Sequence, residues 1–202
     1  MTITYVTGNH GKYISVKEKF AKHNIPIEFY NYDFEELNIN DIEIISKNKA
    51  EKAYGILNQP CFVADSGFYV RNYPNNPGYP GAFAKRSGIA DNVDKFLKVM
   101  ENVTEREAFF LDCVTFYDGN EFYTFFGECE GTISYEKRGN HIAKAKSNLW
   151  YVFVPKNHNK TLAEMTDEER ENRHDGHTSA YEEFINWYKN NYLTQKCLKK
   201  IK

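Results

Sequence analysis

Two short stretches of the sequence combine residue types that suit phosphate chemistry. The first, residues 7–12, has the sequence Thr-Gly-Asn-His-Gly-Lys between an apolar run and a helical pattern. Free backbone N–H groups at a helix start, the positive end of the helix dipole and a lysine together make an anion site. The stretch is not a Walker A loop, because two residues separate Gly8 from Gly11 and Tyr13 follows Lys12. A tight turn with a solvated lysine is the alternative.

The second stretch is Asp65-Ser66-Gly67, directly after the apolar run at residues 61–64. A carboxylate at the carboxyl end of a buried strand is suited to holding a metal-bound water or to taking its proton. The alternative is an Asx-turn, which this segment alone would favour. Glu35 and Glu36, which follow the second predicted strand, are the nearest other carboxylates in the expected topology. Mg²⁺ needs only one or two carboxylates when phosphates and water complete its coordination.

The charge balance argues against a general binder of nucleic-acid duplexes. The 202 residues include 26 Lys and Arg against 28 Asp and Glu, and the isoelectric point is near 6.3, so there is no overall cationic surplus for phosphate backbones. The four cysteines form no C-x-x-C pair, which predicts neither a zinc site nor a disulfide framework and favours the cytoplasm. No apolar run approaches the ~20 residues of a membrane span, so we expect no membrane partner.

Apolar periodicity predicts alternating strands and helices in the first third of the chain. The expected strands are residues 2–7, 25–32 and 61–64, and the expected helices begin at Gly11 and cover residues 41–57. The Asp-Ser-Gly stretch is expected to form the turn that closes the third strand. This order indicates an open α/β sheet, in which ligands bind beyond the carboxyl ends of the strands. Both stretches are therefore expected to contribute to one site.

The middle of the chain is predicted to be rich in strands. Residues 72–88 contain several Pro and Gly residues and form a candidate lid loop. The later expected elements are a helix at 92–100, a hairpin of 108–117 and 121–126, strands at 131–137 and 149–154, and an amphipathic helix around 180–188. Residues 1–195 are expected to form a single domain, and the basic tail at 196–202 to be frayed.

Taken in order along nearly the whole chain, these segments resemble the inosine/xanthosine triphosphate pyrophosphatase family. Thr7-x-Asn9-x-x-Lys12 resembles the family's phosphate loop, and Asp65-Ser66-Gly67 resembles its Asp-Ser-Gly motif. Residues 78–81, Gly-Tyr-Pro-Gly, are similar to its Gly-x-Pro-Gly loop, and Lys49 lies sixteen residues before Asp65, where the family has a phosphate-binding lysine. Three further segments, at 127–133, 136–139 and 160–165, also resemble family segments in register.

The resemblance implies an elongated α/β domain with a central mixed sheet flanked by helices and a β-rich second lobe, assembled as a homodimer. It implies hydrolysis of a nucleoside triphosphate, with Mg²⁺, to the monophosphate and pyrophosphate. It also implies the roles of particular residues. The implied catalytic residues are Asp65 and Lys12, the implied metal ligands are Glu36 and Asp65, and the implied substrate-binding residues are Thr7, Asn9, Lys12, Lys49, Ser66 and Lys160. Trp150, Arg173 and His177 stand in the stretches that correspond to the family's base-reading segments, and we predict that they bind the base here.

The sequence departs from the family pattern at three places. Ala64 stands where the family usually has a second acid, and Ser147-Asn148-Leu149-Trp150-Tyr151 stands in place of its Phe-Gly-Tyr-Asp-Pro segment. The family's base-reading Ser-His-Arg triplet is absent from residues 172–179. We therefore expect a weakened or redirected base preference, toward a non-canonical or modified purine. The alternative function is a nucleotide-binding protein of the same fold with lost or altered catalysis.

Overall fold

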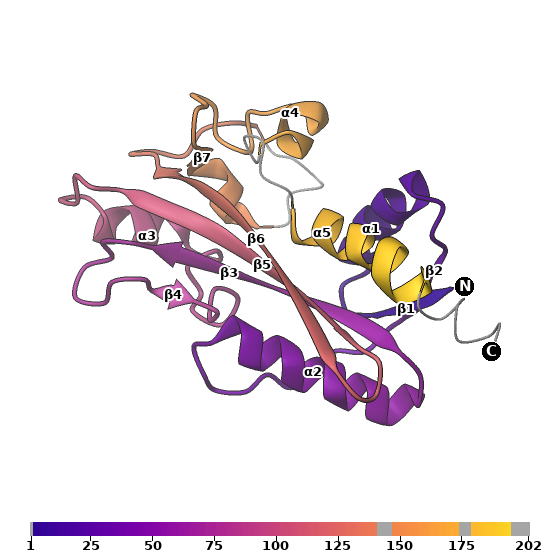
Figure 1. Ribbon diagram of the computed structural model, residues 1–202. Helices are drawn as coiled ribbons and strands as arrows, with labels where there is room; N and C mark the ends of the chain where they lie inside the picture. The colour runs from indigo at the N-terminus through magenta and orange to yellow at the C-terminus, as the bar shows by residue number, and fades with distance from the viewer. Residues whose placement is uncertain (1, 141–146, 174–178, 195–202) are drawn as a thin grey trace, which may run out of the picture.

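Seven strands form one mixed sheet in the computed structural model, which describes residues 2–140, 147–173 and 179–194 (Figure 1). The strands are β1 (Ile3–Val6), β2 (Ile27–Tyr30), β3 (Cys61–Val70), β4 (Pro80–Gly81), β5 (Glu107–Tyr117), β6 (Phe122–Ile133) and β7 (Phe153–Pro155). Their order is β2-β1-β3-β5-β6-β7, and β4 pairs with β3. β1 is parallel to both β2 and β3, whereas the other pairings are antiparallel. The predicted mixed α/β sheet is confirmed.

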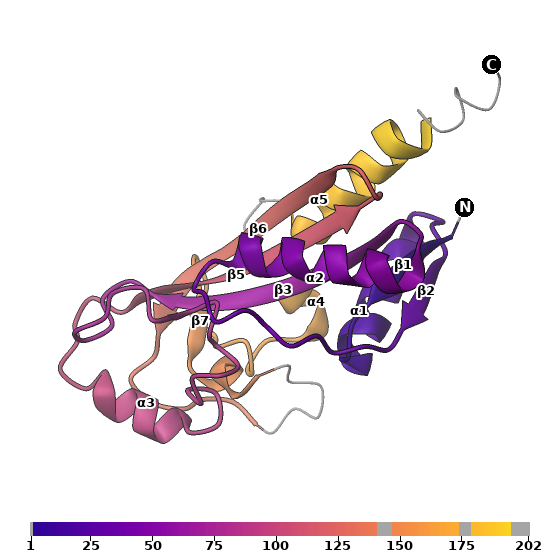
Figure 2. The same cartoon turned by 90° about the horizontal axis from the view of Figure 1, so that it is seen from below.

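Helices cover both faces of the sheet at its parallel end. The helices are α1 (His10–Lys22), α2 (Ile42–Leu57), α3 (Val93–Val99), α4 (Asp167–Glu171) and α5 (Ala180–Trp187), with a 3₁₀ turn η1 (Asn148–Tyr151) and a π-helical turn η2 (Tyr188–Leu193). Figures 1 and 2 show α2 on one face and α1 with α5 on the other. Side-chain oxygens cap the first turns of α1 and α2 at Asn9 and Asp41, as these residue types do at helix starts.

The sheet carries two hydrophobic clusters on the face of α1 and α5, one toward each end. The first cluster includes Phe62, Phe116 and Phe184 and lies under α1 and α5. The second includes Phe68 and Phe153 and lies under α3, η1 and β7. A third, smaller cluster lies between the sheet and α2. Because β3, β5 and β6 contribute side chains to both large clusters, the molecule is elongated, with the β-rich second lobe that the family resemblance implies.

The structure corrects three details of the sequence-based prediction. Asp65-Ser66-Gly67 is not a turn, because the ladder to β5 continues through all three residues to Val70. Tertiary pairing overrides the turn preference of these residue types. The strand predicted at 131–137 is instead the end of β6, which stops at Ile133.

The predicted strand at 149–154 begins as η1, whose start is capped by the Ser147 hydroxyl, and only residues 153–155 pair with β6.

The candidate lid loop is partly held to the sheet, because β4 within it pairs with β3. Within the described ranges, no helix is long and apolar enough to cross a membrane. The predicted frayed tail at 196–202 lies outside the described residues.

Candidate active site

A notch in the sheet edge brings the two predicted phosphate-chemistry stretches together. β1 pairs with β3 at Cys61 and Phe62, and β4 pairs with β3 at Phe68 and Tyr69. Between these pairings, residues 64–67 of β3 have ladder partners on the β5 side alone, among the described residues. The connection from β1 to α1 leaves the sheet beside this unpaired edge. Side chains of residues 64–67 alternate between the two faces of β3 along this unpaired edge.

The stretch at residues 7–12 forms the end of β1 and the start of α1. The Asn9 side-chain oxygen accepts a hydrogen bond from the Lys12 backbone N–H at 2.9 Å, and the Asn9 N–H donates to Thr7 Oγ1 at 3.1 Å. α1 has no acidic residue in its first turn, so the positive end of its dipole is not neutralised locally. The helix start and Lys12 are suited to hold an anion.

A close approach of two backbone segments fixes where this loop lies. A Cβ placed on Gly8 would stand 2.7 Å from the Cβ of Asp33, which belongs to the connection between β2 and α2. Only glycine fits there without a shift. The contact brings the connection, which carries Glu36, past the carboxyl end of β1. The acidic side chains of this connection therefore border the notch.

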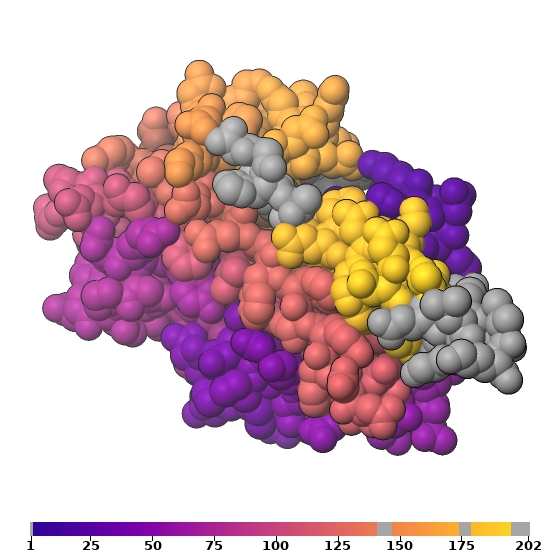
Figure 3. Space-filling model, in the orientation of Figure 1, coloured from indigo at the N-terminus to yellow at the C-terminus, as the bar shows by residue number. Residues whose placement is uncertain are grey.

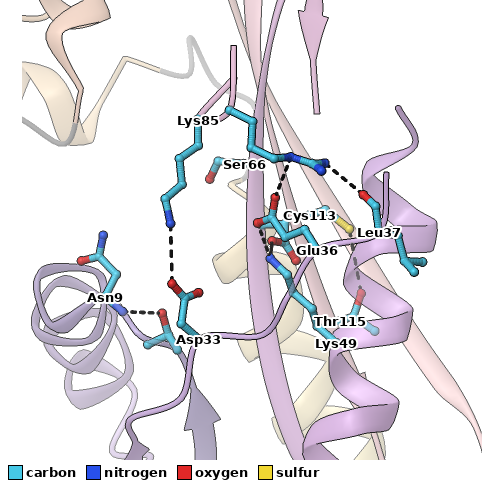
Figure 4. Close-up of polar contacts among 12 residues, drawn as sticks. Asn9, Asp33, Glu36, Leu37, Lys49, Ser66, Lys85, Cys113 and Thr115 are labelled. Carbon is cyan, nitrogen blue, oxygen red and sulfur yellow. Dashed lines mark hydrogen bonds and ion pairs between the residues drawn. The ribbon is translucent and has the colours of Figure 1, made fainter. Parts of the chain in front are cut away.

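On the α2 face of β3, Lys49 bridges two carboxylates from distant parts of the chain (Figure 4). Its Nζ lies 2.7 Å from Glu36 Oε1 and makes a very short contact with Asp65 Oδ1. The side chains of Lys49 and Asp65 are 12% and 11% exposed. The second oxygen of Asp65, Oδ2, is buried and has no hydrogen-bond partner among the described residues. An oxygen of this kind is free to accept a proton or bind a cation.

Lys49 stays charged in this position. Burial by itself lowers the pKa of Lys49, but the charges and hydrogen bonds of Asp65 and Glu36 outweigh burial and raise the pKa above its usual value.

The thiol of Cys113 lies beside Asp65, because the two residues pair between β5 and β3. Burial raises the pKa of this thiol to about 12, so it is protonated at neutral pH and does not act as a nucleophile.

Two further cations reach the notch from the loop after β4. Arg86 Nε lies 3.5 Å from Glu36 Oε2, and its Nη2 donates to the Leu37 carbonyl at 3.0 Å. Lys85 Nζ lies 3.6 Å from Asp33 Oδ2. In the view of Figure 4, the Lys85 and Asp33 pair lies between Asn9 and the Glu36 and Lys49 cluster. The notch is thus bordered by lysines and an arginine from three segments, with carboxylates interspersed.

Comparisons with known proteins identify the family of this chain. A model described as "Ham1 family" matches residues 3–187. The chain belongs to the Ham1 family. A protein of Saccharolobus solfataricus named dITP/XTP pyrophosphatase is 34% identical over 182 residues, which cover 90% of this chain and 91% of that protein. A protein of Methanopyrus kandleri with the same name is 31% identical over 95% of this chain and 98% of its own length.

Solved Ham1 structures share the fold. The structure of a HAM1 protein from Coxiella burnetii superposes with a TM-score of 0.75 at 22% identity, covering 91% of this chain and 97% of that chain. The Staphylococcus aureus Ham1 protein gives a TM-score of 0.67 at 23% identity, covering 98% of this chain and all of the other. The elongated sheet with its two lobes is therefore the Ham1 architecture.

The residues of this Ham1 protein fit a divalent cation at the notch. Glu36 and Asp65 converge on one point, and the buried Oδ2 of Asp65 lacks a partner among the described residues. No group of three or more His, Cys, Asp or Glu side chains suited to a metal occurs in the described part of the chain. Mg²⁺ binds through one or two carboxylates when substrate phosphates supply other oxygens, so two carboxylates suffice.

The remaining predicted substrate-binding residues lie away from this cluster. Ser66 points to the opposite face of β3, where it donates to Asp112 Oδ1 at 2.5 Å. Trp150 lies in η1, and the Arg170 guanidinium lies 5.4 Å from its ring centroid. Lys160 Nζ pairs with Glu169 at 2.7 Å. Each of these residues already has a partner in the fold.

Two predicted base-binding residues lie at or beyond the end of a described range. Arg173 follows α4 and donates to the carbonyl of Arg170, and its guanidinium also lies beside the buried thiol of Cys129 on β6. His177 lies outside the described residues, so its predicted role stays a prediction. We call the region of Trp150 and Arg173 the nucleoside side, and its role in binding the base stays a prediction.

Sequence reasoning missed Arg86, Lys85 and Asp112. The signal for the first two was present, because Lys85-Arg86 is a basic pair at the end of a Pro- and Gly-rich loop. The signal for Asp112 was a single charged residue inside the apolar run of residues 108–117. A charge inside a strand that packs on both faces needs a partner or a ligand.

Proposed function

We propose that this protein hydrolyses a nucleoside triphosphate at the α–β anhydride bond, releasing a nucleoside monophosphate and pyrophosphate. The observation that carries the proposal is the Lys49 bridge between Glu36 and Asp65, beside the start of α1 and Lys12. Phosphoryl transfer depends mainly on positioning and on neutralising charge. The relatives named dITP/XTP pyrophosphatase support the same class of reaction.

The proposed roles divide between the two faces of β3. Lys12 and the first turn of α1 hold phosphate oxygens on one face, with Thr7 and Asn9 fixing the shape of the loop. On the other face, Lys49 neutralises phosphate charge once the substrate competes for its carboxylate partners. Asp65 Oδ2 accepts the proton of the attacking water. The water oxygen bonds to phosphorus, the anhydride bond breaks, and its electron pair leaves with pyrophosphate.

Glu36 and Asp65 are the residues that would hold Mg²⁺. The ion supplies charge neutralisation at the phosphate oxygens when it is bound. Because Ala64 contributes no carboxylate and Lys49 occupies both acids, we expect weak binding of Mg²⁺ until nucleotide is present. Isothermal titration of the nucleotide-free protein with Mg²⁺ measures this, and tight binding would contradict it.

The deciding experiment is a product assay on a panel of triphosphates. Inosine, xanthosine, guanosine and adenosine triphosphates and their deoxy forms are incubated with the protein and Mg²⁺, and pyrophosphate and phosphate are assayed separately. We expect pyrophosphate and monophosphate in equal amounts from at least one substrate, and no product with a chelator or with Asp65→Asn. Release of phosphate alone would refute the proposed bond.

A second candidate function, nucleotide binding without turnover, rests on the absence of the family's base-reading motifs and of a second acid at position 64. A nucleotide-binding protein without turnover would bind triphosphates in the same assay and release neither product. The position of Ala64 and the absence of the base-reading segments are the observations that favour it. The homodimer implied by the family resemblance is also a proposal, which light scattering of the purified protein tests.

A further inference from the structure

A polar row crosses the sheet at the junction of the two large hydrophobic clusters. Ser66 on β3 pairs with Asp112 on β5, which pairs with Gly127 on β6. Residues opposite one another in an antiparallel ladder lie on the same face, so all three are on the face of α1 and α5. The row replaces apolar side chains on three adjacent strands at the same level.

The clusters on either side show that the row marks a boundary. On β5, Phe110 packs in the cluster under α3, whereas Val114 packs in the cluster under α1 and α5. On β3, Phe68 and Phe62 divide in the same way. In Figure 3, the segment around α4 and helix α5 lie over different parts of the strands, as the two clusters require. The row therefore lies at the level where the two clusters meet.

Helix α5 begins directly over one end of this row. A Cβ placed on Gly127 would stand 2.4 Å from the backbone nitrogen of Ala180, the first residue of α5. Glycine is required there because the helix start rests on the strand. Side-chain space on this row is consequently left to Ser66, which is exposed, and Asp112, which is partly buried.

Under the proposed function, Asp112 lies beyond the phosphates of a bound nucleotide, toward its nucleoside part. Neighbouring strands are about 4.8 Å apart, so Asp112 is one strand beyond Ser66 as seen from the phosphate loop at the end of β1. The next strand, β6, carries Cys129, beside which the Arg173 guanidinium lies. A nucleotide whose phosphates occupy the notch would place its nucleoside part over β5.

The chemistry of the pair is that of a hydrogen-bond acceptor. Ser66 donates to Asp112 Oδ1, which orients the carboxylate, and a carboxylate has further lone pairs that can accept hydrogen bonds. A carboxylate repels phosphate but binds neutral O–H and N–H donors. Ribose hydroxyls are commonly bound by Asp or Glu for this reason, and the N1–H of a 6-oxopurine is the comparable donor on a base.

We propose that Asp112, positioned by Ser66, is a specificity-determining residue that accepts a hydrogen bond from the nucleoside part of the substrate. This inference rests on the proposed function. The shared chemistry is a neutral O–H or N–H donor, with the ribose 2′-hydroxyl and the purine N1–H as its two sources. The family's base-reading motifs are absent from residues 147–151 and 172–179. The proposed hydrogen bond to Asp112 would recognise the nucleoside in their place.

The test compares substrate ratios in Asp112→Ala, Asp112→Asn and the unaltered protein. The ratio of kcat/KM for inosine triphosphate over deoxyinosine triphosphate reports the 2′-hydroxyl, and the ratio of inosine over adenosine triphosphate reports N1–H. We expect Asp112→Ala to lower one of these ratios about tenfold, the scale for a lost hydrogen bond to a charged acceptor. Asp112→Asn, which keeps one acceptor oxygen, should lower the same ratio by less.

A purely structural Asp112 would behave differently. If the carboxylate only supports the start of α5, both ratios stay constant while Tm and all rates fall together, and that result would overturn the proposal. Glu107→Gln, on the same strand and exposed, is the matched control and should leave both ratios and the rates unchanged. Pyrophosphate release by the unaltered protein, measured in the same assay, tests the proposed function separately.

Discussion

The proposed phosphate side of the site, around Lys12, Lys49 and Asp65, and the proposed nucleoside side, around Trp150 and Arg173, are held by different contacts. On the phosphate side, charged residues from three distant segments converge on one another, as in the contact of Lys49 with Glu36 and Asp65. On the proposed nucleoside side, the predicted residues contact one another's segment, since the Arg170 guanidinium lies 5.4 Å from the Trp150 ring centroid and Arg173 donates to the Arg170 carbonyl. The difference teaches that the proposed phosphate side depends on contacts between segments far apart in the chain, whereas the residues predicted to bind the base contact a single late segment.

The largest effect is expected from Asp65→Asn. The amide keeps the size of the side chain but cannot take a proton from water, so turnover should fall by about 10²-fold or more. Circular dichroism should show an unchanged fold, and Tm serves as the control for stability. If the variant retains the full rate, Asp65 takes no part in the reaction, and the assignment of catalysis to the phosphate side is wrong.

Removal of Lys49 is expected to cost stability as well as activity. Lys49→Met leaves Glu36 and Asp65 facing each other without their shared cation, and the free energy of unfolding at pH 7 should fall by on the order of 3 kcal/mol. Urea unfolding measures this. Lys47→Met, which loses only an exposed pair with Glu43, is the matched control and should change stability by less than about 1 kcal/mol.

The same variant gives a pH dependence with a defined sign. Because the folded-state pKa of Lys49 is raised, its stabilisation is fully present below the unfolded-state value of about 10.4 and is lost as pH rises through the folded-state value. The stability difference between the unaltered protein and Lys49→Met should therefore be constant through neutral pH and shrink above about pH 10.4. A difference that disappears already near pH 8 would contradict the assigned ion pairs.

A smaller effect is expected from Lys12→Ala, which sharpens the assignment within the phosphate side. Triphosphate binding should weaken about tenfold more than monophosphate binding, because charge-assisted contacts are lost only where the additional phosphates lie. Titration calorimetry with both nucleotides gives the two Kd values. Lys17→Ala, on the same helix and one turn further along, is the control. Equal losses for the two nucleotides would indicate a structural role for Lys12.

The smallest effect concerns the unaltered protein itself. With the family's base-reading residues replaced, the kcat/KM for inosine triphosphate should exceed those for guanosine and adenosine triphosphates by well under 10²-fold. Steady-state kinetics on the three substrates decides this. A preference of ~10²-fold or more would show that another arrangement reads the base, and would make the nucleoside side as specific as the phosphate side.

Local sequence patterns predicted much of the fold because they follow from side-chain periodicity and capping. The alternation around β1, α1 and α2 was predictable from apolar spacing, and the capping oxygen of Asn9 follows from residue type. The continuation of β3 through Asp65-Ser66-Gly67 was not predictable, because the ladder partner lies more than forty residues away on β5. Local propensity favours a turn at this place, and long-range pairing outweighs it.

The candidate site divides in the same way. The choice of Lys49, Asp65 and Glu36 came from spacing and resemblance, and the structure brings these three together. Their mutual ion pairs were not predictable, since they depend on how the connection between β2 and α2 passes the end of β1. Asp112 was missed for a related reason. Its significance depends on Ser66 and Gly127, which become its neighbours only in the sheet.

The uninterrupted strands that join the two lobes limit how the molecule can close on a ligand. β3, β5 and β6 pass from one hydrophobic cluster to the other without leaving their ladders, so the lobes are not connected by a flexible linker that could act as a hinge. Any closure must come from bending or twisting of the sheet itself, which strains backbone hydrogen bonds on both sides of the polar row. Opening of one cluster is thereby coupled to opening of the other, and amide hydrogens of β3 and β5 on the two sides should exchange as one cooperative unit.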